Sequence, residues 1–499
     1  MIRKKGFIIS TRVFNILLFS VFSATLIVTA SFHEFWRDEL QAWMIAHYSH
    51  SFHELFFNSR YDGHPSLWFI LLFLLKQVSQ SLMAMKALHV CIALVSAILL
   101  IRYSPFNRIT RFLVIFGYFF LYEYAVISRN YAIGVMLLFT FCSLFRFRHQ
   151  TRYFYLLVFI LAVLMQASFY SFFLACCLAM VLFVEVVFNK GSFESGSVRK
   201  IFPSLLIILA GILLFITDTL PPPDYGYAAG WNLSFDRELL TTTIDRVWDT
   251  FVPVPQPVLH FWNSNIIVSP DLRAWLAILL LPELFYCLIR KKMAMLLFYS
   301  GLLILMAFNY FKFHGYMRHN GHIFLLFIVT LWLQYYLPGK EVNNKNFARF
   351  MLYGILAIQV IACVMVIGCE LTFRFSQAEY AADYIRKNRG NEYLVIGHND
   401  SGASSVSAYL ERTFYYPRSK RFGTFILWDQ RRENINLSIP GFVSLGTDAA
   451  TSRHQKPLFL ITAPIENPGQ FGLVEDARFE PSVEPFESYY IYELSGHSE

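Results

Sequence analysis

Two adjacent acids, Asp38 and Glu39, stand in a short polar segment, residues 33–64, between two apolar stretches of the sequence. A carboxylate at the mouth of a water-filled cavity can accept the proton of an alcohol as the alcohol attacks an electrophile. The same segment holds five of the 14 histidines, and a polar cluster between membrane spans is costly to keep. We therefore take Asp38 and Glu39 as catalytic candidates; the competing interpretation is an anchor at the membrane surface.

Basic residues near this pair, and in one later segment, are candidates for binding phosphate. Arg37 precedes Asp38, and His64 precedes Pro65, a residue favoured at a first helical position. His64 would then lie beside a helix amino terminus, which attracts anions. Arg129 lies between two apolar runs and needs a partner there, for which Glu123 or a lipid phosphate is a candidate.

Residues 312–320 form a second cationic segment, which includes Tyr316, Arg318 and His319. If this segment is an exterior loop, its positive charge runs against the usual distribution and indicates an anionic ligand. Arginine gives bidentate contacts to phosphate. We expect Arg318 and His319 to contact a phosphate; contact with lipid headgroups alone is the alternative.

The elements that must position these residues are membrane helices. The chain has 499 residues, of which 56% are hydrophobic and only 15% are charged, against about 25% charged in soluble domains. Apolar runs recur between residues 14 and 371, so the sequence predicts a mainly helical, polytopic membrane bundle of about 11–13 spans. The stretch 65–101 looks like two spans, although the charge pattern requires an odd number of crossings there.

The net charge of +8 fits a membrane protein better than a nucleic-acid partner. Basic residues gather in the short connectors 102–111, 146–152, 190–200, 290–292 and 340–349, which places these inside and the carboxyl end outside.

All seven cysteines lie in apolar runs, which argues against a disulfide framework or a Cys-based metal site. No cofactor is predicted. His33, Glu34 and Asp38 could hold a divalent cation, but no spacing demands it.

Two further regions complete the sequence. The segment 218–271 is predicted to form a long exterior loop with an amphipathic helix at 235–251, which is either a cap over a site or a structural lid.

Residues 373–499 are soluble in composition and are predicted to form a small α/β domain. We expect helices at 378–387 and 401–414 and strands at 393–396, 422–428 and 457–462. Residues 397–402 are compatible with anion binding but lack a dinucleotide fingerprint.

The order of these motifs resembles the GT-C superfamily, polyprenyl-phosphate-dependent glycosyltransferases such as protein O-mannosyltransferases and the lipid A aminoarabinose transferase. Asp38 stands where that family has its catalytic Asp, with Glu39 as the usual neighbour. His64 and Pro65 match a segment whose basic residue, often Lys before Pro-Pro, lies near the donor phosphate. The run from Ser128 to Ala132 is similar to an Arg-x-Tyr-Ala stretch of bacterial members, which adds Tyr131 to the donor-site candidates. The likeness covers residues 1–372.

The resemblance implies transfer of a sugar, with inversion, from a polyprenyl-phosphate donor to a hydroxyl acceptor on the non-cytoplasmic face of a bacterial inner membrane. Asp38 would act as base, and the lipid phosphate would leave without help from a second carboxylic acid. Its charge would be held by some of the basic groups Arg37, His64, Arg129, Arg318 and His319. The alternatives are a lipid-linked polysaccharide polymerase or ligase and, less well matched, a transporter, for which we find no internal repeat.

Overall fold

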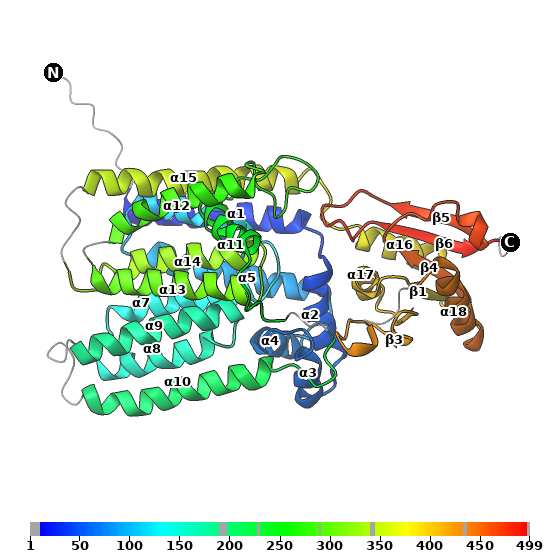
Figure 1. The fold of residues 1–499 in the computed structure, drawn as a ribbon, viewed down its shortest axis with the longest axis horizontal. Coiled ribbons are helices and arrows are strands. Elements are labelled where there is room, and N and C mark those ends of the chain that lie inside the picture. The colour runs from blue at the N-terminus through cyan, green and yellow to red at the C-terminus, as the bar shows by residue number, and fades with distance from the viewer. Residues whose placement is uncertain are drawn as a thin grey trace, which may run out of the picture.

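The computed structural model describes residues 10–188, 197–226, 230–288, 291–339, 345–432 and 437–496. It consists of a helical bundle with a smaller α/β part at one end (Figure 1). The bundle contains α1 (Thr11–Phe32), α2 (Arg37–Tyr48), α3 (Phe52–Ser59), α4 (Leu67–Leu75), α5 (Leu82–Tyr103), α6 (Arg108–Ile115), the π-helix η1 (Tyr118–Glu123), α7 (Tyr131–Phe145), α8 (Thr151–Leu164), α9 (Phe169–Phe188), α10 (Ser197–Thr219), α11 (Arg237–Phe251), α12 (Pro270–Leu288), α13 (Lys292–Phe311), α14 (Met317–Leu333) and α15 (Lys345–Glu370).

The bundle has the composition of a membrane-embedded protein. Within the described ranges, six helices are long and apolar enough to cross a membrane, namely α1, α5, α9, α10, α13 and α15. Leu206, Leu209 and Leu213 form an exposed stripe along α10, and such a surface is stable against lipid but unfavourable in water. The helix α14 lies at the centre, where all 17 of its residues are buried. The predicted mainly helical membrane protein is confirmed at this level.

The stretch 65–101 contains one helix of crossing length, not two. The helix α4 has nine residues, which gives about 14 Å at 1.5 Å per residue, whereas the hydrocarbon core is about 30 Å thick. At its carboxyl end, Lys76 Nζ donates a hydrogen bond to the His47 carbonyl oxygen at 2.9 Å. Both ends of α4 therefore lie beside the 33–64 segment, and of these two helices only α5 is long and apolar enough to cross a membrane.

The beginning of α4 differs from the sequence expectation. Ser66 is the residue that precedes the first turn, so Pro65 lies outside the helix and the prediction of Pro65 at its first position is wrong. The Ser66 backbone N–H donates to Asp218 Oδ2 at 2.8 Å. The amino terminus of α4 thus has an acidic partner, as the positive end of a helix dipole favours. That partner is the side chain of Asp218 and not a bound ligand.

The α/β part comprises α16 (Ala378–Asn388), β1 (Tyr393–Gly397), α17 (Asp400–Leu410), β2 (Phe414–Tyr416), β3 (Arg421–Gly423), the 3₁₀ turns η3 (Gln430–Arg432) and η4 (Pro468–Phe471), α18 (Ile439–Ser452), β4 (Lys456–Ile461), β5 (Leu473–Phe479) and β6 (Tyr489–Leu494). The six strands form one sheet in the order β3-β2-β1-β4-β6-β5, with β1 parallel to β2 and β4. Apolar clusters on both faces hold α16 and α17 on one side and α18 on the other.

Most predicted elements of this part are confirmed, since α16, β1, α17 and β4 lie where the sequence placed them, although α17 ends at Leu410. The strand expected at 422–428 is confirmed only at residues 422 and 423, which lie in β3 and pair with β2 in a short hairpin. The two strands β5 and β6 were not anticipated. Of the basic connectors, residues 190–196, 290 and 340–344 lie outside the described residues.

The α/β part docks on the end of the bundle that carries α2 (Figure 1). Gln41 forms a pair of hydrogen bonds with the Ile426 backbone, donating to its carbonyl at 2.8 Å and accepting from its N–H at 3.0 Å. His260 Nδ1 lies 2.9 Å from the Val483 carbonyl oxygen. The helix α2 of the 33–64 segment therefore lies against the α/β part.

Candidate active site

The Asp38 carboxylate lies among three guanidinium groups that come from three distant segments. Its Oδ1 accepts a hydrogen bond from Arg37 Nε at 3.2 Å, and its Oδ2 accepts one from Arg318 Nη2 at 3.1 Å. Arg129 Nη2 lies 3.9 Å from the same Oδ2, and Arg129 Nη1 donates to the Asp38 carbonyl oxygen. Four residues that the sequence singled out separately thus form one cluster.

This cluster carries more positive than negative charge. Burial alone would raise the pKa of the Asp38 carboxyl, but Arg129, Arg37 and Arg318 together hold it well below its usual range. Asp38 is therefore ionised at any physiological pH, and its carboxylate lies within ion-pair distance of all three guanidinium groups. The Asp38 side chain is 21% exposed, so the cluster is accessible from outside. A second anion, such as a phosphate, would be stabilised here.

Arg318 lies in the first turn of α14 and is buried. The expectation of a cationic loop over 312–320 is wrong in this respect, because α14 begins at Met317. The Arg318 guanidinium carbon lies 5.2 Å from the Trp36 ring, 5.3 Å from the Trp262 ring and 4.9 Å from the Tyr316 ring. Aromatic faces on several sides attract the cation and fix its orientation toward Asp38.

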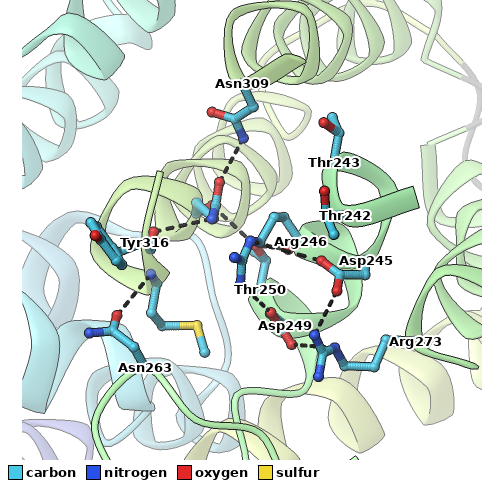
Figure 2. A network of polar contacts seen from close by, with 12 residues as sticks. Thr242, Thr243, Asp245, Arg246, Asp249, Thr250, Asn263, Arg273, Asn309 and Tyr316 are labelled. Carbon is cyan, nitrogen blue, oxygen red and sulfur yellow. Dashed lines mark hydrogen bonds and ion pairs between the residues drawn. The ribbon is translucent and has the colours of Figure 1, made fainter. Parts of the chain in front are cut away.

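A polar network holds the first turn of α14 in place (Figure 2). Asn263 Oδ1 accepts from the Met317 backbone N–H at 3.1 Å. Asn309 Nδ2 donates to Asn320 Oδ1 at 2.7 Å, and Thr250 Oγ1 donates to the Asn320 carbonyl oxygen at 3.1 Å. Three segments thus fix the backbone that carries Arg318.

The helix α11 confirms the amphipathic helix predicted at 235–251 and packs beside this turn. Arg273 of α12 bridges its two acids, with Nη2 at 2.6 Å from Asp245 Oδ2 and Nε at 3.2 Å from Asp249 Oδ1. Arg246 Nη1 contacts Asp249 Oδ2 at 3.1 Å (Figure 2). These buried pairs tie α11 to α12, and of the two interpretations offered above they support a structural element.

Arg129 reaches Asp38 with the help of His64. Arg129 Nη2 lies 3.0 Å from His64 Nε2, and because a guanidinium can only donate, His64 must carry its proton on Nδ1. Burial and the adjacent Arg129 lower the pKa of His64 to about 3, so His64 is neutral. Its buried Nδ1–H has no hydrogen-bond partner among the described residues.

Glu123 is not the partner of Arg129, as the sequence had allowed. Its Oε2 accepts from the Tyr118 hydroxyl at 2.8 Å and from Trp262 Nε1 at 3.2 Å. It therefore holds the Trp262 ring that packs against Arg318. The acidic partner of Arg129 is Asp38.

Glu39 has surroundings very different from those of Asp38. It is fully buried, its Oε2 lies 3.0 Å from His33 Nε2, and its Oε1 accepts from the Ser128 backbone N–H. His33 Nδ1 in turn lies 2.8 Å from Glu370 Oε1 at the end of α15. Burial disfavours protonation of His33, but Glu39 and Glu370 raise its pKa to about 10. A charged imidazolium thus joins α2, the 128–130 segment and α15.

The site also contains acids that sequence reasoning missed. Burial raises the pKa of Asp62 to about 6, against the opposing effect of Arg129. Burial likewise raises the pKa of Glu487 to about 7, and its Oε1 accepts from the Arg37 backbone N–H at 2.6 Å. Asp62 stood within the polar segment quoted above, whereas nothing in the sequence linked Glu487 to position 37.

The remaining predicted donor-site residues surround this cluster. Tyr131 and His319 are buried, with ring centroids 5.8 Å apart, and the Tyr131 hydroxyl has no hydrogen bond of good geometry among the described residues. His319 Nδ1 accepts from the Tyr316 backbone N–H at 2.8 Å. Tyr316 itself is half exposed and covers Arg318.

A divalent cation held by His33, Glu34 and Asp38 does not fit this arrangement. Both His33 nitrogens face carboxylates, and Glu34 Oε2 accepts from the Phe375 backbone N–H at 2.9 Å. Within the described parts of the chain, no group of three or more His, Cys, Asp or Glu side chains is placed to hold a metal ion.

The assembled cluster brings together an ionised carboxylate, three guanidinium groups and an imidazole N–H without a hydrogen-bond partner among the described residues. Comparison of the chain with protein family models, with curated proteins and with solved structures finds no match. Its function is therefore argued from this geometry and from the sequence motifs.

Proposed function

We propose that the protein is a membrane glycosyltransferase of the GT-C type that moves a sugar from a polyprenyl-phosphate donor to a hydroxyl acceptor. The observation that carries the proposal is the single carboxylate, Asp38, within contact of Arg37, Arg129 and Arg318. A candidate base and three candidate phosphate-binding groups therefore contact one another at the end of the helical bundle that carries α2.

In this reaction the acceptor hydroxyl attacks the anomeric carbon while its proton passes to Asp38. The bond between the anomeric carbon and the phosphate oxygen breaks, and polyprenyl phosphate leaves with the electron pair. Arg129 and Arg318 stabilise the charge that grows on the leaving phosphate, and the neutral His64 donates its Nδ1–H to the same group. Attack opposite the leaving phosphate inverts the configuration.

Donor binding would also activate the base. In the free protein the three arginines make Asp38 a very weak base. A phosphate that binds Arg129 and Arg318 would neutralise part of their positive charge and would add a negative charge near Asp38. Both effects raise the pKa of the Asp38 carboxyl. Asp38 would thus accept a proton efficiently only when the donor is in place, which limits unproductive proton transfer.

The buried Glu39 acts in this scheme as a positioning residue, because its contacts with His33 and Ser128 fix the helix that presents Asp38. We further propose about 11–13 spans, a site and an α/β part on the non-cytoplasmic face of a bacterial inner membrane, and the lipid bilayer as the source of the donor. Cysteine-labelling of exposed positions in intact cells tests this orientation.

The experiment is turnover by the purified full-length protein of a panel of short-chain polyprenyl-phosphate sugars, followed by mass spectrometry of released polyprenyl phosphate and glycosylated acceptor. Asp38→Asn should abolish product, whereas the matched surface variant Asp383→Asn should retain it. Failure of every donor in the panel would contradict the proposal. Flux across vesicles without donor turnover would favour a transporter, and loss of activity only on changes in 218–271 would favour a polymerase or ligase.

A further inference from the structure

The α/β part holds a pocket of about 750 Å³ that the proposed transfer reaction does not use. It lies where the three parallel strands end, since His398 and Asn399 follow β1, Arg418 follows β2 and Thr462 follows β4. Ligands of open α/β sheets bind outside the carboxyl ends of the strands, at the point where the strand order reverses. The pocket occupies such a position.

The reversal lies between β1 and β4. From β1 the chain passes through α17 to β2 on one side, and α18 later returns it to β4 on the other side. Ala403 of α17 packs with Val395 on one face of the sheet, and Phe442 of α18 packs with Ile396 on the opposite face. Because the two helices lie on opposite faces, a crevice remains between the strand ends.

The lining of this pocket combines amide and hydroxyl groups with aromatic rings. Thr462, Asn467 and Gln470 offer both hydrogen-bond donors and acceptors. Phe471 and Phe486 also line it, and the Phe486 side chain is 55% exposed. A sugar ring presents the matching surface, because its hydroxyls both donate and accept while its C–H faces pack against aromatic rings.

A phosphorylated ligand such as a nucleotide fits this pocket poorly. At the start of α17, Asn399 Oδ1 already accepts from the Ser401 backbone N–H at 3.2 Å. Asp400 occupies the first turn, where Arg432 holds it at 2.7 Å, and Glu466 adds a carboxylate to the lining. Arg418 also lines the pocket, but Glu466 offsets its charge, and the first turn of α17 has one backbone N–H occupied and a carboxylate where a phosphate would bind.

We propose that this pocket is a binding site for an uncharged carbohydrate of one or two rings, a function beyond the transfer reaction and independent of it. The site has a direct connection to the cluster around Asp38. Pro485 and Phe486 line the pocket, and the next residue, Glu487, contacts the Arg37 backbone N–H at 2.6 Å. The pocket is therefore one residue along the chain from a contact of the candidate active site.

Saturation-transfer NMR on the purified full-length protein tests this site, with free hexoses, N-acetylhexosamines and their disaccharides as probes and UDP as a charged comparison. We expect saturation of at least one sugar and none of UDP. Phe486→Ala should weaken binding about fivefold by removing one aromatic contact. Val474→Ala is the matched control, because Val474 is also 55% exposed but lies on β5 outside the pocket.

The measurement is repeated on Asp38→Asn, which should bind the sugar as the unchanged protein does even though its transfer is lost. Retained binding in that variant separates this site from the candidate active site. The proposal is overturned if no sugar in the panel binds, if UDP binds in their place, or if Phe486→Ala and Gln470→Ala both leave sugar binding unchanged.

Discussion

Replacing His33 by Gln should remove a large, pH-dependent share of the stability. His33 lies between Glu39 and Glu370, with nitrogen–oxygen distances of 3.0 and 2.8 Å, and all three side chains are fully buried. These carboxylates raise the pKa of His33 from 6.5 to about 10. At about 1.4 kcal/mol per pH unit, that rise corresponds to about 5 kcal/mol. Loss of one partner from a buried pair costs about 3–5 kcal/mol in general.

The direction of the pH effect follows from the sign of this shift. A group with a raised folded-state pKa contributes its full stability below its unfolded value, here 6.5, and loses it as the pH rises toward about 10. The unfolding temperature in detergent should therefore fall across this range in the unchanged protein. His33→Gln should be less stable at pH 6.5 and show a much smaller fall.

The assay is a thermal unfolding series at half-unit pH steps, with His53→Gln as the control because His53 is an exposed histidine of the same polar segment. Other groups that titrate above pH 8 affect both variants equally and cancel in the difference between them. An equal pH dependence in His33→Gln and the unchanged protein would refute a charged imidazolium at this position.

Three further predictions concern the site and its support. Arg129→Gln should raise the KM for a polyprenyl-phosphate donor about tenfold or more through the lost charged contact to phosphate; an unchanged KM would exclude Arg129 from the donor site. Because the pKa of Asp62 is about 6, its carboxylate should compete for Arg129 above that pH, so donor affinity should rise as the pH falls from 7 to 5. In Asp62→Asn this rise should vanish, and a persistent rise would assign it to another group. Gln41→Ala leaves the buried Ile426 N–H and C=O unpaired, which should cost about 1–3 kcal/mol and speed proteolysis of the α/β part; unchanged digestion would contradict this role.

Apolar periodicity predicted much of the fold, because burial in lipid and burial in a sheet both leave strong patterns. The helix α11 and the strands β1 and β4 follow from such patterns. The prediction of two spans over residues 65–101 failed at α4, which has nine residues. An apolar run indicates that a helix is buried, but it does not indicate whether the helix is long enough to cross a membrane. The strands β5 and β6 mix exposed and buried residues without a clean alternation, so no period marked them.

The site was predictable as a set of residue types but not as a set of contacts. Asp38, Arg129 and Arg318 each stood out because charge beside apolar sequence is costly. Their mutual contact depends on tertiary packing across 91 and 280 residues of sequence, which no local pattern records. The same holds for Glu370 and Glu487, which reach the site from α15 and from the α/β part.

The measurement that tests the central claim most directly compares donor binding and sugar transfer in Asp38→Asn on the same preparation. A base contributes about 10²–10⁴ to the rate, so transfer should fall by about that factor. Donor binding should persist or tighten, because the substitution removes the carboxylate that pairs with Arg37, Arg129 and Arg318. Transfer within a few fold of the unchanged protein, or loss of donor binding in a folded variant, would contradict the account.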